Sequence, residues 1–245
     1  MSGAISTGIG STAWGVSHPG PRDKNEDAFL ILSLGDAYLL AVADGLGGHE
    51  KGELASKIAV ETLRRTFEEN YEASMGDEDI GELLRGAYWE IHREILGLSS
   101  EPGKVGTTLT SAFVRSGKAV IANTGDSRAY LIRDGQVIER TRDHSIVEEL
   151  LERGVIGPEE VRSHPMRHVV TRALGIGFEV DVYTWRIENG DILILSTDGL
   201  HDVLSDGRIG EIASEGDSRG IAERLVEEAL KVTGDNVTVV VFMEV

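Results

Sequence analysis

The chain has 245 residues, 40% of them hydrophobic and 27% charged, which is the composition of a globular protein and not of a collagenous or disordered one. It carries 24 Lys and Arg against 42 Asp and Glu, a formal net charge of −18, so its field repels nucleic acid and anionic lipid and neither is expected as a partner. The absence of cysteine excludes disulfides and thiolate metal sites, and no apolar stretch is long enough to cross a membrane. We expect a soluble, cytoplasmic protein.

The first part of the chain predicts two strands followed by two helices. Residues 28–34 and 38–43 are short apolar runs bounded by Asp or Gly, the pattern of buried strands. Two later segments place apolar residues three and four positions apart, as amphipathic helices do. Their stripes are Leu54, Ile58, Leu63 and Phe67, and then Ile80, Leu83, Leu84, Ala87, Tyr88, Ile91 and Ile95.

The middle of the chain predicts three strands and one irregular segment. The strands are 109–115, 119–123 and 129–132, and turn signals such as Ser116-Gly117 favour hairpins between them, hence antiparallel sheets. Residues 144–175 instead carry many charges, a Gly157-Pro158 break and a weak helical pattern. This segment is either a surface excursion that carries specificity or a peripheral helix pair without a role.

The last part of the chain predicts strands at 180–187, 192–196 and 237–245, with one helix before the final strand. The apolar stripe of that helix is Ile221, Leu225, Val226, Ala229 and Leu230. Runs of strands with amphipathic helices between them predict an α+β fold of two packed sheets covered by helices. Because no linker or repeat divides the chain, we expect one domain over residues 1–245.

Acidic residues recur at the ends of the predicted strands. Asp44 and Asp198 each follow a strand and precede a glycine, and Asp126 comes just after another strand. Those that precede strands are Glu26, Asp27 and Asp235. Since antiparallel neighbours place the end of one strand beside the start of the next, these carboxylates are expected at one rim of the fold. Any single Asp-Gly pair is equally consistent with turn chemistry.

Such a gathering of carboxylates requires positive charge, because two like charges a few ångströms apart repel by roughly 4 kcal/mol at an effective dielectric of 20. Arg22 and Arg128 lie near these acidic residues but supply only two positive charges, so divalent cations are the simplest source of the rest. Oxygen ligands without cysteine select Mg²⁺ or Mn²⁺ over Zn²⁺ or copper. Two such ions sharing a water would produce a hydroxide-like nucleophile suited to phosphate-ester hydrolysis.

Eight short motifs, in order from Arg22 to Thr238, resemble those of the PPM (type 2C) metal-dependent protein Ser/Thr phosphatases of bacterial type. They are Arg22-x-x-Asn25-Glu26-Asp27, Val42-Ala43-Asp44-Gly45-Leu46-Gly47-Gly48-His49, Gly106-Thr107-Thr108, Ala122-Asn123-x-Gly125-Asp126-Ser127-Arg128, Asp143-His144-Ser145, Arg172-Ala173-Leu174-Gly175, Ser196-Thr197-Asp198-Gly199-Leu200 and Asp235-Asn236-x-Thr238. The resemblance implies a four-layer αββα sandwich, and residues 144–175 match the family's flap in position. We call residues 144–175 the flap.

The resemblance also implies the roles of individual residues. Asp44 would bridge two core ions of Mn²⁺ or Mg²⁺, Asp198 and Asp235 would hold the first, and Glu26 with the carbonyl of Gly45 would help to hold the second. Many bacterial members bind a third, weaker ion, for which Asp126 is the matching ligand, with Asp198 as a candidate to share it. Asp27 and Asn236 would lie just outside the ligands, where Asp27 orients metal-bound water.

Arg22 matches the arginine that grips the substrate phosphate, a role that suits a guanidinium because it can take two phosphate oxygens at once. Leu46 occupies the place where animal members have a histidine assigned as general acid. His49 lies three residues further on, and the role is not transferred to it. The identity of the general acid therefore stays open, with a metal-bound water as one candidate.

The main hypothesis is a protein serine/threonine phosphatase that acts through a water or hydroxide bridging two metal ions. Phosphoproteins and a cognate Ser/Thr kinase are the implied partners, and we expect a monomer. One alternative is a phosphoprotein-binding regulator whose metal site has lost its ligands. The presence of every expected metal carboxylate argues against this alternative. Another is hydrolysis of a small phosphoester or nucleotide. A Ser-His-Asp relay at 143–145 is disfavoured, because neighbours on an extended strand point to opposite faces.

Overall fold

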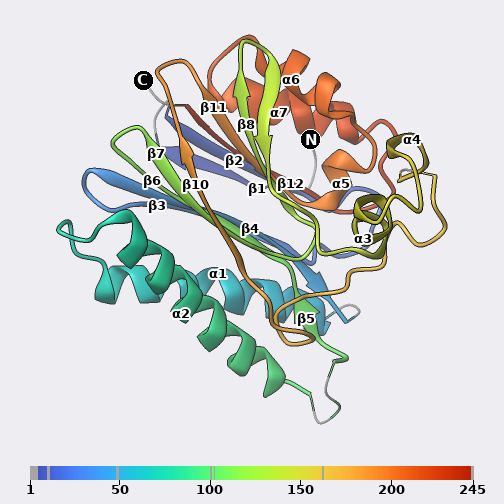
Figure 1. The fold of residues 1–245 in the computed structure, drawn as a ribbon, viewed down its shortest axis with the longest axis horizontal. Coiled ribbons are helices and arrows are strands. Elements are labelled where there is room, and N and C mark those ends of the chain that lie inside the picture. The colour runs from blue at the N-terminus through green and yellow to red at the C-terminus, as the bar shows by residue number, and fades with distance from the viewer. Residues whose placement is uncertain are drawn as a thin grey trace.

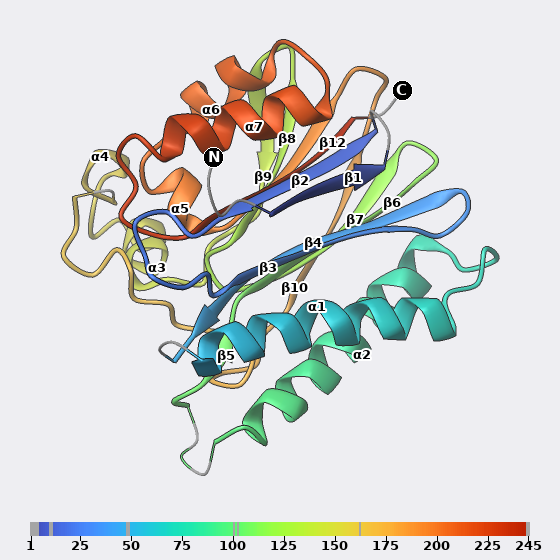
Figure 2. The same ribbon diagram turned by 180° about the vertical axis from the view of Figure 1, so that it is seen from behind.

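Two antiparallel sheets pack face to face and are covered by helices on both outer sides, as Figures 1 and 2 show. The computed structural model describes residues 5–9, 12–47, 50–99, 101, 103–161 and 163–243. The two packed antiparallel sheets with helices on both outer sides confirm the predicted αββα sandwich.

The first sheet joins the two ends of the chain. Its strand order is β1 (Ile5–Ile9), β2 (Ala13–His18), β12 (Val237–Met243), β11 (Ile192–Ser196), β8 (Arg128–Arg133) and β9 (Gln136–Arg140). The helices on its outer side are α6 (Asp206–Ala213) and α7 (Ser218–Ala229), with the short α5 (Asp198–His201) at one end (Figure 2). Val237 of β12 pairs with His18 of β2, so residues far apart in sequence meet at the same strand ends.

The second sheet carries the two long helices. Its strand order is β10 (Asp181–Arg186), β7 (Lys118–Thr124), β6 (Leu109–Arg115), β4 (Ala37–Leu46) and β3 (Asp27–Ser33), and β5 (Gly106–Thr107) pairs with the end of β4. The helices α1 (Glu50–Asn70) and α2 (Asp77–Leu96) lie along its outer face (Figure 1). Each layer thus has an apolar face to bury, which is why the strands read as nearly continuous hydrophobic runs.

Three buried clusters hold the layers together. Leu40, Val42 and Leu195 belong to the cluster between the sheets. Leu63, Leu84 and others pack α1 and α2 on the second sheet, and Leu225 and its neighbours pack α7 on the first. Most residues of the predicted helical stripes are buried, but Ile58, Leu83 and Leu230 are only partly buried and Leu54 is 46% exposed.

Among the described residues, the prediction missed four strands, β1, β2, β5 and β9, and two short helices. β9 was missed because it is a half-exposed edge strand with few apolar residues, and β2 because Trp14, Gly15 and Ser17 break the run of branched residues. The helices α5 and α6 span four and eight residues, too short for a clear helical period.

The flap contains the weak helices suggested by its sequence, α3 (Ile146–Glu152) and α4 (Pro158–Val161). The side chain of Ser145 accepts a hydrogen bond from the Glu148 N–H and so caps α3. Figures 1 and 2 both place α3 and α4 beside α5, at one end of the sandwich. Within the described residues, no helix has the length and apolar character that crossing a bilayer requires.

Candidate metal centre

The strand-end carboxylates do meet at one rim. A cavity of about 580 Å³ opens there, and seven of the residues that line it come from the predicted set. These are Glu26, Asp44, Gly45, Asp198 and Asp235, with Arg22 and Asn236 at the same cavity. Asp27 and Asp44 face each other across β3 and β4 as directly paired residues. The strand-end argument therefore places these groups together as predicted.

Asp126 lies in a second cavity, of about 540 Å³, which opens beneath the flap. Arg128, Asp143 and Asp202 line this cavity too. The charge of Asp126 nevertheless acts on the first group, since it helps to raise the pKa of both Asp44 and Asp198.

Burial and mutual repulsion make the carboxylates of the rim hard to ionise without cations. Burial raises the pKa of Asp44 well above its ordinary value, and the charges of Asp198 and Asp27 raise it further. Burial likewise raises the pKa of Asp198 well above its ordinary value, and Asp126 adds to the shift. A site with this many adjacent carboxylates is suited to multivalent cations, which would lower these pKa values again.

Two oxygens support the same conclusion. Oδ1 of Asp198 and Oδ1 of Asp27 are buried and have no hydrogen-bond partner among the described residues. A buried carboxylate oxygen without a partner is costly. Hard divalent ions such as Mn²⁺ and Mg²⁺ bind oxygen donors of this kind, so the residues present fit the metal pair implied by the sequence.

Hydroxyl groups that the sequence analysis did not identify hold Asp27 in place. Its Oδ2 accepts hydrogen bonds from Thr197 Oγ1 at 2.9 Å and Thr238 Oγ1 at 2.7 Å. These donors lower the pKa of Asp27, but burial has the larger effect and the result is about 7. Thr238 Oγ1 also lies 2.7 Å from Ser17 Oγ, so β12, supported by β2, and the residue that follows β11 fix one carboxylate of the second sheet.

Asp44 is held by its backbone. Its N–H donates to Thr108 Oγ1 at 2.9 Å, and its carbonyl accepts from Thr107 Oγ1 at 2.8 Å. Thr107 and Leu174 also exchange two backbone hydrogen bonds, which connect the end of the flap to β5. The two threonines of the Gly-Thr-Thr motif therefore fix the backbone of Asp44, and with it the place of its carboxylate at the end of β4.

Asn236 acts as a brace for the loop before β3. Its Oδ1 accepts from the Glu26 N–H at 2.8 Å, while its Nδ2 donates to the carbonyls of Pro19 and Lys24, each at 2.8 Å. All the hydrogen-bonding groups of the amide are used, so its orientation is fixed. The amide of Asn236 thereby holds the backbone of Glu26 against the loop of Pro19 and Lys24.

Arg22 stands at the open edge of the cavity. Its Nη2 contacts Asp235 Oδ2 at 2.9 Å, and its Nε donates to the carbonyl of Gly234 at 2.9 Å. The Arg22 side chain is 58% exposed, so the exposed ion pair holds it only weakly. The guanidinium is thus placed where an incoming anion can reach it.

The glycines of the two Asp-Gly pairs are required by packing and not by turn geometry. A Cβ on Gly45 would collide with the carbonyl of Gly52, and one on Gly199 with the carbonyl of Asn236. The alternative of ordinary turn chemistry is therefore not favoured for these pairs. Gly47 does adopt a positive φ of 124°, while Gly48 and His49 lie outside the described residues.

The Asp143-His144-Ser145 motif forms no relay, as predicted. Asp143 pairs with Arg128, with 2.7 Å between its Oδ1 and the arginine Nε. His144 Nδ1 accepts from the Gly125 N–H at 3.2 Å, and His144 Nε2 lies 3.3 Å from Asp181 Oδ2. Each side chain of the motif therefore fixes a different part of the flap base.

Comparison with known proteins identifies the family. A sequence model of the family described as Protein phosphatase 2C matches residues 14–230. A serine/threonine phosphatase, stp, from Listeria monocytogenes is 36% identical over 228 residues, covering 89% of each chain. The Mycobacterium tuberculosis protein phosphatase PstP is 37% identical over 236 residues, which cover 90% of this chain and 42% of PstP.

Solved structures agree with the sequence matches. Stp1 from Staphylococcus aureus superposes with a TM-score of 0.89 at 33% identity, covering 98% of each chain. The catalytic domain of PstP, solved in complex with two manganese ions, superposes with a TM-score of 0.78 at 31% identity, also over 98% of each chain. The chain therefore belongs to the protein phosphatase 2C family.

Proposed function

We propose that this chain removes phosphate from phosphoserine and phosphothreonine in proteins, with two Mn²⁺ or Mg²⁺ ions held at the rim cavity by its own carboxylates. The family is one of metal-dependent protein phosphatases, and the relative solved with two manganese ions has the same fold. The observation that carries the proposal is the cavity where carboxylates of four chain segments meet and Asp198 Oδ1 has no protein partner.

The ligand roles follow from position at the cavity. We assign Asp44 as the carboxylate shared by both ions, Asp198 and Asp235 to the first ion, and Glu26 with the Gly45 carbonyl to the second. When bound, the ion pair would polarise phosphate oxygens and lower the pKa of a coordinated water so that it becomes a nucleophile near neutral pH. Asp27 and Asn236 would orient the ligands and their water from behind.

Arg22 is the proposed phosphate-binding residue. Its guanidinium can exchange the weak, exposed contact with Asp235 for two hydrogen bonds to phosphate oxygens. This orients the substrate with its phosphorus towards the carboxylates. Because Leu46 occupies the place of the animal-type histidine, no side chain of the family motif serves as the general acid there, and we expect a water molecule to protonate the leaving oxygen.

The broader context of the activity is proposed on less direct grounds. We propose one domain over residues 1–245, interrupted by the flap, since β2 and β12 from opposite ends of the chain are neighbours in one sheet. Phosphoproteins are the substrates that follow from the family, and a cognate Ser/Thr kinase is the expected opposing enzyme. We further propose a cytoplasmic monomer, supported by the strongly acidic composition.

The test is phosphate release from phosphothreonyl peptides compared with release from nucleotides, each with Mn²⁺ and with chelator. We expect peptide turnover that depends on the metal and exceeds nucleotide turnover. Mg²⁺ should restore activity after chelation, whereas Ca²⁺ should do so poorly because it prefers more ligands and a larger site. Full activity in chelator, or a preference for nucleotides, would contradict the proposal.

A further inference from the structure

His92 of α2 is a buried histidine that lines neither the rim cavity nor the second cavity. Its Nδ1 accepts the N–H of Gly175, the last residue of the flap, at 2.9 Å, and only 7% of His92 is exposed. A backbone N–H can only donate, so Nδ1 is unprotonated and the ring carries its proton on Nε2. The contact therefore requires a neutral imidazole.

The surroundings of His92 are aromatic and keep the ring neutral. The Trp89 ring stacks on the imidazole with 5.6 Å between centroids, and the Phe178 ring lies at 5.2 Å. Burial lowers the pKa of His92, and no charge among the described residues contributes to the shift. The charged side chains of the neighbouring elements are exposed or bound elsewhere: Arg93 is exposed, Arg85 donates to the Val180 carbonyl, Glu90 and Glu94 pair with Arg65, Lys104 pairs with Glu101, and Arg172 pairs with Glu179.

The backbone at Gly175 is packed too closely to find another acceptor easily. Gly175 has a positive φ of 86°, and a Cβ there would lie 2.3 Å from Ile95 Cγ2 and 2.6 Å from the Val105 carbonyl oxygen. A buried N–H needs an acceptor, because leaving it unpaired costs free energy. His92 supplies that acceptor.

The turn that contains Gly175 leads to Asp44. Leu174 and Thr107 exchange two backbone hydrogen bonds, of 2.9 and 3.0 Å, and Thr107 Oγ1 donates to the Asp44 carbonyl at 2.8 Å. Figure 1 shows the chain passing beside β5 between the flap and β10. A continuous set of backbone and side-chain contacts therefore connects His92, in the outer helix layer, to the residue proposed to bridge the two ions.

We propose that His92 is a positioning residue whose unprotonated Nδ1 holds the end of the flap and, through Thr107, the backbone of Asp44. We call the hydrogen bond between His92 and Gly175 the clamp. Protonation would turn Nδ1 into a donor, so an imidazolium cannot form the clamp. Because burial lowers the pKa of His92, the clamp stabilises the fold fully above the ordinary pKa of histidine, and this stabilisation is lost as the pH falls below it.

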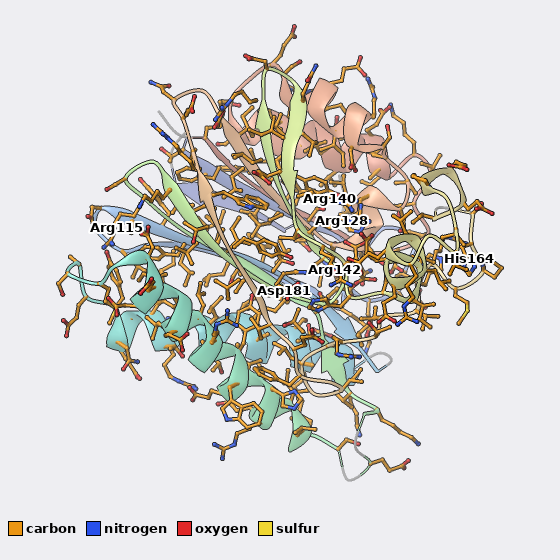
Figure 3. The ribbon with its side chains drawn as sticks, viewed as in Figure 1. Arg115, Arg128, Arg140, Arg142, His164 and Asp181 are labelled. Atoms are coloured by element: carbon orange, nitrogen blue, oxygen red, sulfur yellow. The ribbon has the colours of Figure 1, made fainter. Side chains whose placement is uncertain are left out.

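Two variants separate the acceptor from the ring. In His92→Asn the amide oxygen can accept the same N–H and does not titrate, whereas His92→Leu leaves the Gly175 N–H buried without an acceptor. The matched control is His164→Asn. His164 Nδ1 also accepts a backbone N–H, that of Met166 at 3.2 Å, but it does so on the outer side of the flap (Figure 3).

Hydrogen exchange of the Gly175 amide, followed by NMR in chelator, measures the clamp without metal or substrate. At pH 8 we expect about tenfold less protection in His92→Leu than in the unaltered chain, and unchanged protection in His164→Asn. Between pH 8 and pH 5, protection corrected for the intrinsic exchange rate should fall more steeply in the unaltered chain than in His92→Asn. Equal protection in His92→Leu, or equal pH dependence in His92→Asn, would overturn the clamp.

Equilibrium dialysis with Mn²⁺ tests the step from the clamp to Asp44. At pH 8 the affinity should fall about tenfold in His92→Leu, while His92→Asn and His164→Asn should bind as the unaltered chain does. A histidine that only stabilised the fold would lower the free energy of unfolding in His92→Leu and leave the Mn²⁺ affinity of the folded chain unchanged. That result would overturn the positioning role.

The inference rests on the proposed function because Asp44 is taken as the shared ligand, yet the two can fail separately, since neither readout contains substrate. Manganese affinity that depends on His92, in a chain that hydrolyses no phosphopeptide, would refute the proposed function and leave the positioning role standing. Phosphopeptide hydrolysis, with exchange and affinity unchanged in His92→Leu, would refute the positioning role and leave the function standing.

Discussion

The strand ends and the flap hold their charged residues in opposite ways. At the strand ends, the buried carboxylate of Asp27 is fixed by the hydroxyl groups of Thr197 and Thr238, and the backbone of Asp44 is fixed by Thr107 and Thr108. In the flap the charged groups form ion pairs near the surface, as Arg153 does with Glu149 and Glu152 does with Arg142 just before the flap. Exposed ion pairs contribute little to the free energy of unfolding. The rigid rim therefore sets the chemistry, while the flap is free to vary.

The largest expected effect is on the rim, in Asp44→Asn. The substitution keeps the size of the side chain but removes the charge that two ions would share, so we expect turnover to fall by about a thousandfold. Stability of the metal-free protein should not fall, because repulsion from Asp198 and Asp27 is relieved. Phosphopeptide kinetics and thermal unfolding in chelator measure the two halves of this prediction.

The control for Asp44→Asn is Asp134→Asn, the same change at the exposed hairpin turn between β8 and β9. Asp134 has a positive φ of 50°, which asparagine adopts as readily. Its turnover and melting temperature should match those of the unaltered chain. If Asp44→Asn kept near-normal turnover at saturating manganese, Asp44 would not be the shared ligand.

The next effect concerns the junction between the two regions, where Arg128 of β8 meets Asp143 at the base of the flap. Arg128 Nη2 lies 2.5 Å from Asp143 Oδ2, with side chains 11% and 7% exposed, and Figure 3 shows Arg128 near α3 and α5. Arg128→Ala leaves the Asp143 charge buried without its partner, so the free energy of unfolding should fall by about 3–5 kcal/mol. Denaturant titration measures this loss.

Replacing both partners sharpens that prediction. In Arg128→Met with Asp143→Leu the buried charges are absent together, and most of the lost stability should return. A loss below about 1 kcal/mol in Arg128→Ala would show that the flap base behaves like the exposed pairs of the flap, and the contrast between the two regions would fail there.

The pH dependence of the metal-free protein tests how strongly the buried rim carboxylates destabilise the fold when they are ionised. Burial raises the pKa of Asp27 and of Asp126 from 3.8 to about 7. Between pH 3.8 and about pH 7 the folded state binds more protons than the unfolded state. The free energy of unfolding therefore falls as the pH rises through that window. In chelator the melting temperature should be higher at pH 5 than at pH 8. Added Mn²⁺ should stabilise more at pH 8, where protons compete less.

The opposite order of melting temperatures would contradict the strain assigned to these carboxylates. The Asp27→Asn variant supplies the comparison, because it lacks one titrating group while its neighbours remain. Its melting temperature in chelator should depend less on pH over the same window. Equal slopes for both proteins would remove Asp27 from the explanation.

The sequence alone predicted the rim better than the flap, for a physical reason. Apolar runs identify buried strands in the sequence, and antiparallel pairing then determines which strand ends lie side by side. The sequence alone therefore predicted that Asp44 and Asp198 lie close together. No repeating pattern in the sequence indicates that Thr197 donates a hydrogen bond to Asp27, or that His168 of the flap lies beside Asp202. Their partners are set by how the sheets stack and how the flap folds back, which no local pattern encodes.

The smallest effect is expected inside the flap, in Arg153→Ala. Arg153 Nη2 lies 3.9 Å from Glu149 Oε2 at helical spacing, and its side chain is 73% exposed. The substitution should change the free energy of unfolding by no more than about 0.5 kcal/mol, because solvent screens the pair and ordering two long side chains costs entropy. Denaturant titration beside Arg128→Ala gives the measurement. A loss comparable to that of Arg128→Ala would mean that the flap is held as firmly as the rim, and the freedom of the flap to vary would then need another explanation.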